Sequence, residues 1–496
     1  MRLIYIDIDT QRPDHLGCYG YSRATSPNID RIAADGLRFD RVYASDTPCL
    51  PSRSALATGR FGIHNGAIGH GGTAADLALD GEPRGFRSTL GVASWPTRMA
   101  NLGMRTATIS SFATRHSSYH WLAGFRESYD IGKGGLENAD EVNAVALDWL
   151  DRHGREEDWF LHVHYWDPHT PYRTPASLGD PFADEPLPAW LSEEQRAEHW
   201  KGYGPHSARE VGGFGVNEAM RSYFPRQPLE CPSLAEVRAM IDGYDCGVLY
   251  ADEHAGQLFS KLTDLDVFDD TAVMISGDHG ETLGELNVYG DHQTADEITS
   301  RIPMILRWPG LDVAGDAASR NGKNVDDGFH YQFDVAATVL ELLEARVPSS
   351  WDGQGFAAAL REGRPTGRDS LVLSQAAWTC QRSVRWDDWI AIKTWHDGYH
   401  DFPEWMLFDI ARDPHETRDL AGAKPEVVQE AAGRLDAWQL EMAATATREG
   451  DPMQTVLAEG GPFHTRGQLA KYLVRLRETG REHHARTLEE RHPDEL

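Results

Sequence analysis

The run Leu3-Ile4-Tyr5-Ile6-Asp7-Ile8-Asp9 is rich in β-branched residues and ends in two acids. It predicts a buried β-strand whose carboxyl end carries the acids. The segment from Asn28 to Gly36 follows as a predicted helix closed by glycine. The same alternation recurs at 95–109, 139–164 and 234–275. This order predicts an α/β fold: a large α/β/α sandwich with a mostly parallel central sheet and functional residues at the carboxyl ends of its strands.

The 496-residue chain is long enough for one large and one small domain. Residues 1–365 are expected to form the N-terminal catalytic α/β domain, in which 173–235 is an insertion at the rim of the pocket. Residues 366–450 are expected to form a small C-terminal α+β domain. The charged tail, 451–496, has apolar residues at helical spacing: Leu469, Tyr472, Leu473 and Leu476. They predict a helix that docks on its own body or, alternatively, on a neighbouring subunit in a homo-oligomer.

The charge of the chain restricts its partners. The 48 basic and 77 acidic residues give a net charge of −29. A field of this sign opposes nucleic acid and anionic membrane surfaces, so neither is expected as a partner. An anionic substrate must therefore be held by cations placed locally in a pocket.

Cysteine use and the start of the chain bear on the compartment. The odd count and unpaired spacing of five cysteines fit a reducing environment. The strand pattern begins at once after Met1, which leaves no room for a signal peptide, and no apolar run approaches the length that spans a membrane. We predict a cytoplasmic protein, with a precursor whose leader has been removed as the alternative.

Three clusters of polar residues each follow a predicted strand. Asp7 and Asp9 are two residues apart and share one face of their strand, an arrangement that suits a hard divalent cation. Asp278 and His279 follow the apolar run 271–276, although an isolated Asp-His-Gly is more often a turn. His169 lies in Pro-His-Thr-Pro-Tyr, and its imidazole is suited to proton transfer near neutral pH. In the strand before it, the expected role of His162 and His164 is structural.

The segment Cys49-Leu50-Pro51-Ser52-Arg53, with Thr58-Gly59-Arg60 after it, resembles the signature of the formylglycine-dependent (type I) sulfatases of the alkaline-phosphatase superfamily. In that family a formylglycine-generating enzyme oxidises the cysteine to an aldehyde. One hydroxyl of the hydrated aldehyde attacks sulfur, and the other later expels the bound sulfate. The alternative without a catalytic role is a buried cysteine that precedes a turn. Further resemblance in chain order, over roughly residues 1–440, favours the family.

The resemblance implies a sulfuric ester hydrolase and roles for its residues. Modified Cys49 is the nucleophile, Arg53 holds developing charge, and His169 protonates the leaving oxygen. The metal is one divalent ion, expected to be Ca²⁺, with Mg²⁺ or Mn²⁺ as alternatives. Its expected ligands are Asp9, Asp278 and His279, with the shell completed by Asp7 or by Thr10. Asp7 has a second possible role as an acceptor outside that shell.

The chain departs from the family where sulfatases commonly place two lysines on the sulfate. Around Arg115 no lysine occurs, and His116 is matched only loosely to a family histidine. Asp291 stands where the second lysine is expected, and His292 is either its substitute or a loop histidine. We expect a small-molecule or carbohydrate sulfate ester as substrate. A phosphonate monoester hydrolase or phosphodiesterase is the first alternative, and a silent binding protein with unmodified Cys49 is the second.

Overall fold

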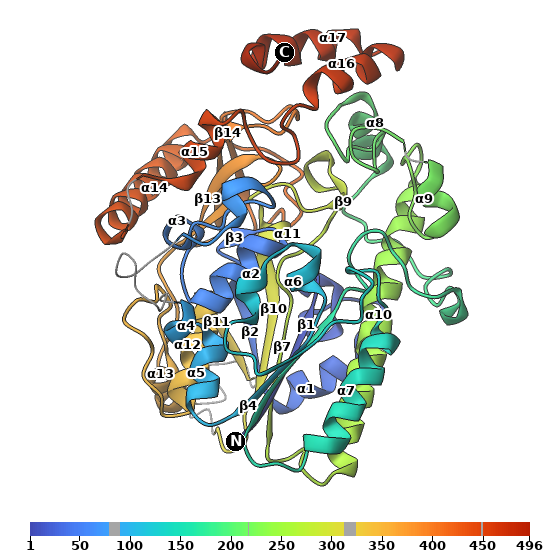
Figure 1. Ribbon diagram of the computed structural model, residues 1–496. Coiled ribbons are helices and arrows are strands. Elements are labelled where there is room, and N and C mark those ends of the chain that lie inside the picture. The colour runs from blue at the N-terminus through green and yellow to red at the C-terminus, as the bar shows by residue number, and fades with distance from the viewer. Residues whose placement is uncertain (79–89, 217, 312–323, 448–449) are drawn as a thin grey trace.

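An eight-stranded sheet runs through the centre of the molecule (Figure 1). The structure is a computed structural model that describes residues 1–78, 90–216, 218–311, 324–447 and 450–496. In spatial order the strands are β11 (Val325–Tyr331), β2 (Leu37–Tyr43), β10 (Arg301–Arg307), β7 (Thr271–Ser276), β1 (Arg2–Ile8), β6 (Trp159–Tyr165), β4 (Arg105–Ile109) and β5 (Glu127–Tyr129). Only β10 is antiparallel to its neighbours in this described sheet. The predicted mostly parallel central sheet is therefore confirmed.

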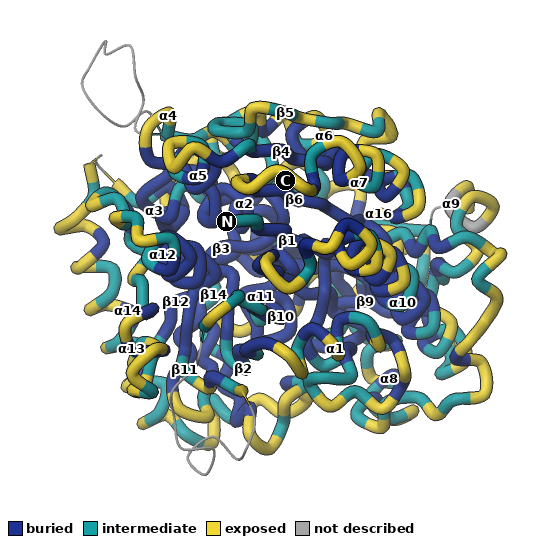
Figure 2. The backbone as a smooth tube through the Cα atoms, turned by 90° about the horizontal axis from the view of Figure 1, so that it is seen from below, coloured by how far each residue is buried: buried dark blue, intermediate teal, exposed yellow. Residues whose placement is uncertain are grey.

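Helices cover both faces of this sheet, and the strands are buried between them (Figure 2). On one face lie α1 (Pro27–Asp35), α7 (Ala139–His153) and α10 (Leu234–Asp264). On the other lie α2 (Cys49–Thr58), α5 (Trp95–Asn101) and α12 (Gln332–Leu342). In β1, Ile4, Ile6 and Ile8 pack toward α10, whereas Leu3 and Tyr5 pack toward α2. The two-residue period therefore directs Asp7 and Asp9 to the side of α2.

Local sequence explains where the long helices begin and how closely α10 packs. Asn138 and Glu141 form a capping box at the start of α7, and the Ser233 hydroxyl accepts from the backbone at the start of α10. Within α10, a Cβ atom at Gly247 would lie 2.5 Å from the carbonyl oxygen of Asp167. Glycine at this position lets α10 support the turn after β6, which carries His169.

A second, five-stranded sheet has the order β15 (Trp405–Asp409), β14 (Trp389–His396), β13 (Cys380–Trp386), β12 (Leu371–Gln375) and β3 (Asp46–Thr47). Helix α14 (Pro425–Thr445) packs against it. These elements form the small α+β unit that the sequence predicts. Its edge strand β3 comes from the N-terminal part of the chain and lies directly before Cys49, so the second sheet crosses the predicted boundary at residue 365.

Shorter elements complete the described chain. The helices are α3 (Gly62–Asn65), α4 (Leu90–Ala93), α6 (Phe112–Arg115), α8 (Glu193–Lys201), α9 (Glu218–Tyr223), α11 (Glu297–Ser300), α13 (Ala357–Glu362), α15 (Pro452–Ala458), α16 (Leu469–Glu478) and α17 (Glu482–Arg491), and the strands β8 (Thr282–Leu283) and β9 (Tyr289–Asp291) form a separate pair. No helix among the described residues is long and apolar enough to cross a membrane.

The C-terminal tail lies against the chain's own body, near α8 (Figure 1). The four apolar residues that predict its helix are buried in α16, where they pack with Tyr203 of the insertion and Tyr399 of the second sheet's loops. Arg481 forms an ion pair with the buried Glu210 of the insertion. The tail thus connects the insertion to the C-terminal unit.

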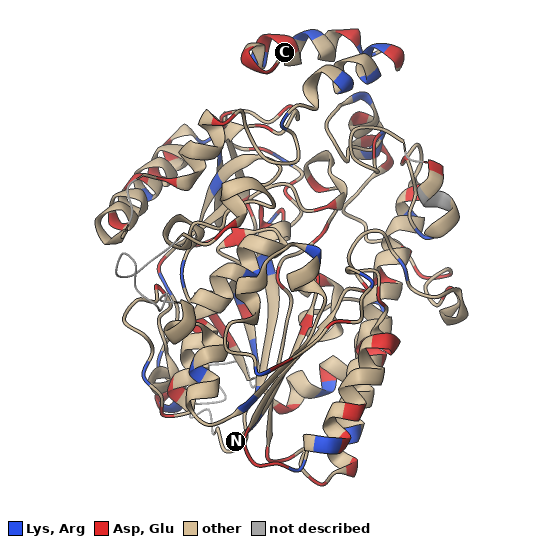
Figure 3. Ribbon diagram, in the orientation of Figure 1, with Lys and Arg blue, Asp and Glu red and all other residues tan. Residues whose placement is uncertain are grey.

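Acidic residues outnumber basic ones on α7, α10 and α14 (Figure 3). On α14 the exposed face carries Glu426, Glu430, Asp436 and Glu441. Acidic residues thus lie on several helices of the periphery. The cations that could hold an anionic substrate must then be sought within the molecule.

The tail contains a pH-dependent contact at His492. Its Nε2 lies 2.9 Å from Asp397 Oδ1 and its Nδ1 2.8 Å from Glu495 Oε1. Burial lowers the pKa of His492, but the two carboxylates outweigh burial and raise it to about 9. Since the folded pKa exceeds the ordinary value of 6.5, the stabilisation is complete below about pH 6.5 and is lost as the pH rises through about 9.

We expect the melting temperatures of wild type and His492→Gln to differ most near pH 6 and to converge above about pH 10. His483→Gln, on the exposed side of α17, is the control and is expected to match wild type throughout. A difference between wild type and His492→Gln that does not change with pH would show that the charge of this ring does not stabilise the tail.

Candidate active site

The carboxyl ends of β1 and β7 meet the amino end of α2. Ligand atoms of Asp9, Cys49, Asp278 and His279 all lie within 4.8 Å of one another, and all four residues are buried. Asp9 follows β1, the Asp278-His279 pair follows β7, and Cys49 is the first residue of α2. The structure thus brings together three segments that are distant in the sequence, at the edge of the sheet where the parallel order places a site.

Cys49 occupies the first turn of α2. Pro51 is tolerated there because the amide that it lacks has no partner in a first turn. The Ser52 hydroxyl donates to the carbonyl oxygen of Asp278 over 2.6 Å, which ties this turn to the end of β7. The Cys49 sulfur lies 3.1 Å from His279 Nε2 and 4.0 Å from His169 Nε2. Burial, followed by the nearby carboxylates, raises the pKa of the thiol well above its usual value, so the residue as translated is a poor nucleophile.

Arg53 lies one helical turn after Cys49 and faces the same centre. Its guanidinium donates to Asp7 Oδ2 at 2.9 Å and Asp9 Oδ2 at 3.0 Å. It also donates to Asp278 Oδ2 at 2.5 Å and to His164 Nε2 at 2.7 Å. Burial opposes ionisation of Asp7, but Arg53 outweighs it and holds the pKa of that carboxyl well below its usual value. Burial, together with the nearby Asp9 and Asp7, raises the pKa of Asp278 well above its usual value despite Arg53. A cation bound among these crowded carboxylates would favour the ionised form of Asp278.

The donor atoms fit a divalent cation. Among the described residues, Asp9 Oδ1 and Thr10 Oγ1 are buried and have no hydrogen-bond partner. The Nδ1 of His279 donates to the carbonyl oxygen of Gly280 over 2.8 Å, so its Nε2 presents a lone pair. That lone pair lies 3.3 Å from Asp278 Oδ2, a repulsive arrangement that a cation would relieve. Asp7 is not one of the four residues whose ligand atoms lie together. Arg53 and His162 contact its Oδ2, while its Oδ1 is buried and has no hydrogen-bond partner among the described residues.

His169 faces this centre from the turn after β6. Its Nδ1 bonds to the carbonyl oxygen of Thr170, and its Nε2 is 4.0 Å from Asp9 Oδ1. The half-buried Arg173 donates to the His169 carbonyl oxygen over 3.1 Å. In the same turn, Asp167 accepts a hydrogen bond from the amide of Ala139 at the start of α7.

The two strand histidines have full sets of partners, as the sequence suggests, but they also contact the site. His162 lies between Thr108 Oγ1 and Asp7 Oδ2, at 2.8 and 3.3 Å. His164 lies 2.8 Å from Ser110 Oγ through Nδ1 and accepts from Arg53 through Nε2. They therefore fix the orientation of the acid and the guanidinium that surround Cys49.

His292 lies beside the centre and His116 lies further out. The His292 ring is 4.2 Å from that of His279 and 5.2 Å from that of His169. Carboxylates of Glu281 and Asp291 flank its two nitrogens at 3.3 and 3.9 Å. His116 stacks over Trp166, with ring centroids 6.4 Å apart.

His70 is a residue of this pocket that our sequence reasoning missed. Its ring lies 5.0 Å from that of His116. Burial lowers the pKa of His70 well below its usual value, and the neighbouring imidazoles, those of His292 and His279 among them, lower it further. No local motif in the sequence marks His70.

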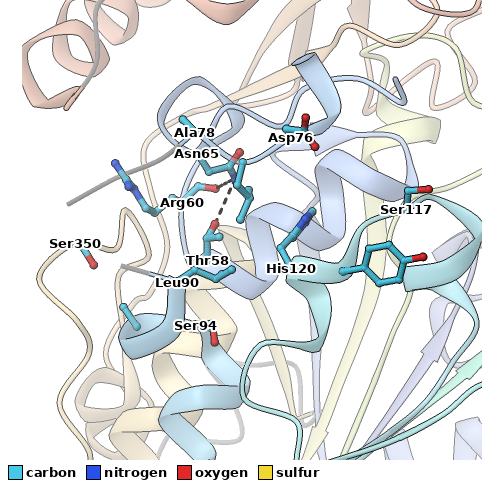
Figure 4. A pocket seen from close by; sticks show the side chains of 13 residues that line it. Thr58, Arg60, Asn65, Asp76, Ala78, Leu90, Ser94, Ser117, His120 and Ser350 are labelled. Atoms are coloured by element: carbon cyan, nitrogen blue, oxygen red, sulfur yellow. Dashed lines mark hydrogen bonds between the residues drawn. The ribbon is translucent and has the colours of Figure 1, made fainter. Parts of the chain in front are cut away.

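A separate cavity of about 480 Å³ lies at the other end of α2 (Figure 4). Thr58, Asn65 and His120 line it, and Asn65 Nδ2 donates to Thr58 Oγ1 over 3.3 Å. The helix between Cys49 and Thr58 is about 13 Å long. This cavity is therefore distinct from the centre around Cys49.

A profile of the Sulfatase family matches residues 2–345. The match covers more than half of the chain, which therefore belongs to the sulfatase family, a family of sulfuric ester hydrolases. The family predicted from the Cys49 motif is confirmed. With the family come, in general terms, a metal ion and a formylglycine derived from cysteine.

Two curated relatives cover nearly the same length. An N-acetylglucosamine-6-O-sulfatase of Bacteroides thetaiotaomicron is 24% identical over 92% of this chain and 89% of its own. The multifunctional alkaline phosphatase superfamily protein PehA of Trinickia caryophylli is 25% identical, over 84% and 90%.

Two solved structures share the fold. One, in complex with its substrate D-glucosamine-2-N,6-O-disulfate, has a TM-score of 0.69 at 21% identity and covers 89% of this chain and 98% of its own. A phosphonate monoester hydrolase of Agrobacterium radiobacter has a TM-score of 0.67 at 17% identity, over 89% and 96%. The fold is that of the alkaline-phosphatase superfamily.

Proposed function

We propose that this sulfatase acts on a sulfate ester at residue 49, after oxidation of Cys49 to formylglycine. The observation that supports it most is the convergence of Asp9, Cys49, Asp278 and His279 within 4.8 Å. Formylglycine supplies, as its hydrate, the attacking hydroxyl and a second hydroxyl for release of the sulfate. The raised pKa of the unmodified thiol supports the need for this modification.

We assign the metal to Asp9, Asp278 and His279. A divalent cation there supplies positive charge that lowers the pKa of the attacking hydroxyl. Ca²⁺ is our choice because the donor set is rich in oxygen, with Mg²⁺ or Mn²⁺ as alternatives. Thr10 and Asp7 both stay candidates for an additional ligand, because Thr10 Oγ1 and Asp7 Oδ1 are each buried without a hydrogen-bond partner among the described residues. The other carboxylate oxygen of Asp7, Oδ2, orients Arg53.

Three further residues have proposed roles in transferring a proton to the leaving oxygen and in binding negative charge. His169 is the proposed acid for the leaving oxygen. Because its Nδ1 donates to the Thr170 carbonyl oxygen, Nε2 has a lone pair in the neutral ring and must first take up a second proton, which it then delivers to the leaving oxygen. Arg53 lies where negative charge develops and, because it is bonded to fixed carboxylates, needs no reorganisation during the reaction. His292 is the proposed substitute for a lysine on the substrate anion, supported by its position between His169 and His279.

For the substrate we propose a carbohydrate sulfate. A relative named N-acetylglucosamine-6-O-sulfatase aligns with 92% of this chain, and a structural neighbour binds a glucosamine disulfate. The second candidate is a phosphonate monoester or phosphodiester. It is supported by Asp291, which stands where a sulfatase lysine is expected, and by the likeness to a phosphonate monoester hydrolase.

Localisation in the cytoplasm stays a prediction. All five cysteines are free thiols in the structure, in agreement with a reducing compartment. A formylglycine-generating enzyme is the partner that the proposed modification needs.

Removal of the metal tests the proposed centre. We expect purified wild type to hold about one divalent ion per chain, and a chelator to remove both the ion and the activity, which Ca²⁺ restores. Asp278→Asn is expected to weaken metal binding by at least about 100-fold. Asp252→Asn, a buried acid that bonds to Asn28 and Ile29 far from the centre, is the control. A full metal content in Asp278→Asn would overturn the assignment.

A further inference from the structure

His464 of the C-terminal tail contacts His70, which lies beside the candidate active site. Its Nε2 is joined by a hydrogen bond of 3.0 Å to Nδ1 of His70, although the two residues are 394 positions apart. The ring of His464 stacks on Trp378, with centroids 4.5 Å apart and planes inclined by 21°. His464 also donates its backbone amide to the carbonyl oxygen of Ala377. Its side chain is thus held between the second sheet's loop and His70.

A second contact fixes the same two segments. The ring of Phe463 lies over Gly71, and a Cβ atom at Gly71 would be 2.1 Å from the ring carbon Cε2. Phe463 and His464 of the tail therefore contact Gly71 and His70 of the loop after α3. Ile68 of this loop packs with Met453 and Val456 of α15. The position of the His70 loop is consequently determined by the tail.

His70 and His116, on this side of the candidate active site, carry nitrogen atoms without hydrogen-bond partners among the described residues. Among the described residues, the Nε2 atoms of His70 and His116 are buried and have no hydrogen-bond partner. Their rings are 5.0 Å apart, and the Trp166 ring links that of His116 to that of His169, 5.7 Å further on. A buried nitrogen without a partner costs free energy unless a ligand satisfies it. Both atoms therefore indicate a polar group of the substrate.

The protonation state of these imidazoles indicates which kind of polar group they can bind. Burial lowers the pKa of His116 to about 3 and that of His464 to about 4, and it lowers the pKa of His70 as well. Neutral imidazoles offer one N–H donor and one lone pair each, whereas a lysine offers donors only. A sulfate group presents acceptors only, but a hydroxyl both donates and accepts. A pair of neutral imidazoles is therefore matched to a hydroxyl.

We propose that His70 and His116 bind a hydroxyl of the sulfated ring, and that His464 of the tail is a positioning residue that fixes His70. The proposal rests on the proposed function and defines its substrate class: a sulfate ester on a ring that carries free hydroxyls. The bond from His464 decides whether Nε2 of His70 bears the proton or the lone pair. The tail is then part of the substrate pocket as well as a structural connection.

Rates on two sulfates test the proposal with full-length, modified enzyme. For N-acetylglucosamine 6-O-sulfate, kcat/KM of His464→Ala is expected to fall about 10-fold. For 4-nitrophenyl sulfate, which has no ring hydroxyl, the loss is expected to stay below about 2-fold. His464→Gln keeps a donor and is expected to recover part of the sugar rate. His483→Ala, exposed on α17, is the matched control and should leave both rates unchanged.

A double-mutant cycle separates positioning from direct contact. Because His464 acts through His70, the variant with both residues changed to alanine should lose no more than His70→Ala alone, within about 2-fold. Additive losses, or equal losses on both sulfates, would overturn the inference. So would a wild type that cleaves only the aryl sulfate, although the proposed sulfatase function would then stand. A wild type that cleaves neither sulfate would overturn both.

Discussion

Cys49→Ala is expected to lower kcat/KM for a sulfate ester by at least about 10⁴-fold. Residue 49 is buried, 3.1 Å from His279 and one helical turn from Arg53, so no other side chain can take its position. The variant removes only the sulfur atom from the first turn of α2, so we expect the fold to remain. Initial rates, with metal content and melting temperature measured on the same samples, check the prediction.

Cys231→Ala is the matched control. Cys231 is also a buried free thiol, but it belongs to the insertion and packs in the apolar core. We expect its activity to stay within about 2-fold of wild type. If Cys49→Ala keeps more than about a tenth of the wild-type rate, residue 49 is not the nucleophile.

Arg53→Lys is expected to lower kcat/KM by at least about 10²-fold. The arginine bonds simultaneously to three carboxylates and to His164. A lysine keeps the charge, but its single nitrogen cannot reproduce the planar fork that joins Asp7 to Asp9. Arg53→Ala should add a loss of stability of about 3–5 kcal/mol, because buried carboxylates lose their partner.

Arg23→Lys distinguishes the catalytic effect from the structural one. Arg23 is likewise buried and pairs with Asp242 and Asp245, outside the centre. The Arg23→Lys substitution is expected to lower the free energy of unfolding without changing kcat/KM by more than about 2-fold. A nearly normal rate for Arg53→Lys would mean that Arg53 serves stability alone.

Residues that stand next to a strand end or in a contiguous motif could be placed from the sequence. Asp9 follows β1, and Asp278 and His279 follow β7, so the parallel sheet brings them to one edge. Cys49 and Arg53 are joined by helical spacing within α2. The sandwich itself could be predicted because the strand and helix periods alternate clearly along the first part of the chain.

Contacts that depend on distant packing could not be placed. The bond of His70 to His464 spans almost the whole chain, and neither residue lies in a patterned segment. Strand β3 has two residues, too few to show a period, yet it ties the second sheet to Cys49. Asp167 is close to His169 in sequence, yet its carboxylate accepts from the backbone amide at the start of α7, a contact that the local sequence does not indicate.

The most direct test of the central claim is the ratio of kcat/KM for a matched aryl sulfate and aryl phosphodiester. It should be measured on protein in which the peptide that contains residue 49 has the mass of the aldehyde. A sulfatase built on this centre is predicted to prefer the sulfate by at least about 10-fold. A preference of the same size for the phosphodiester would contradict the assignment.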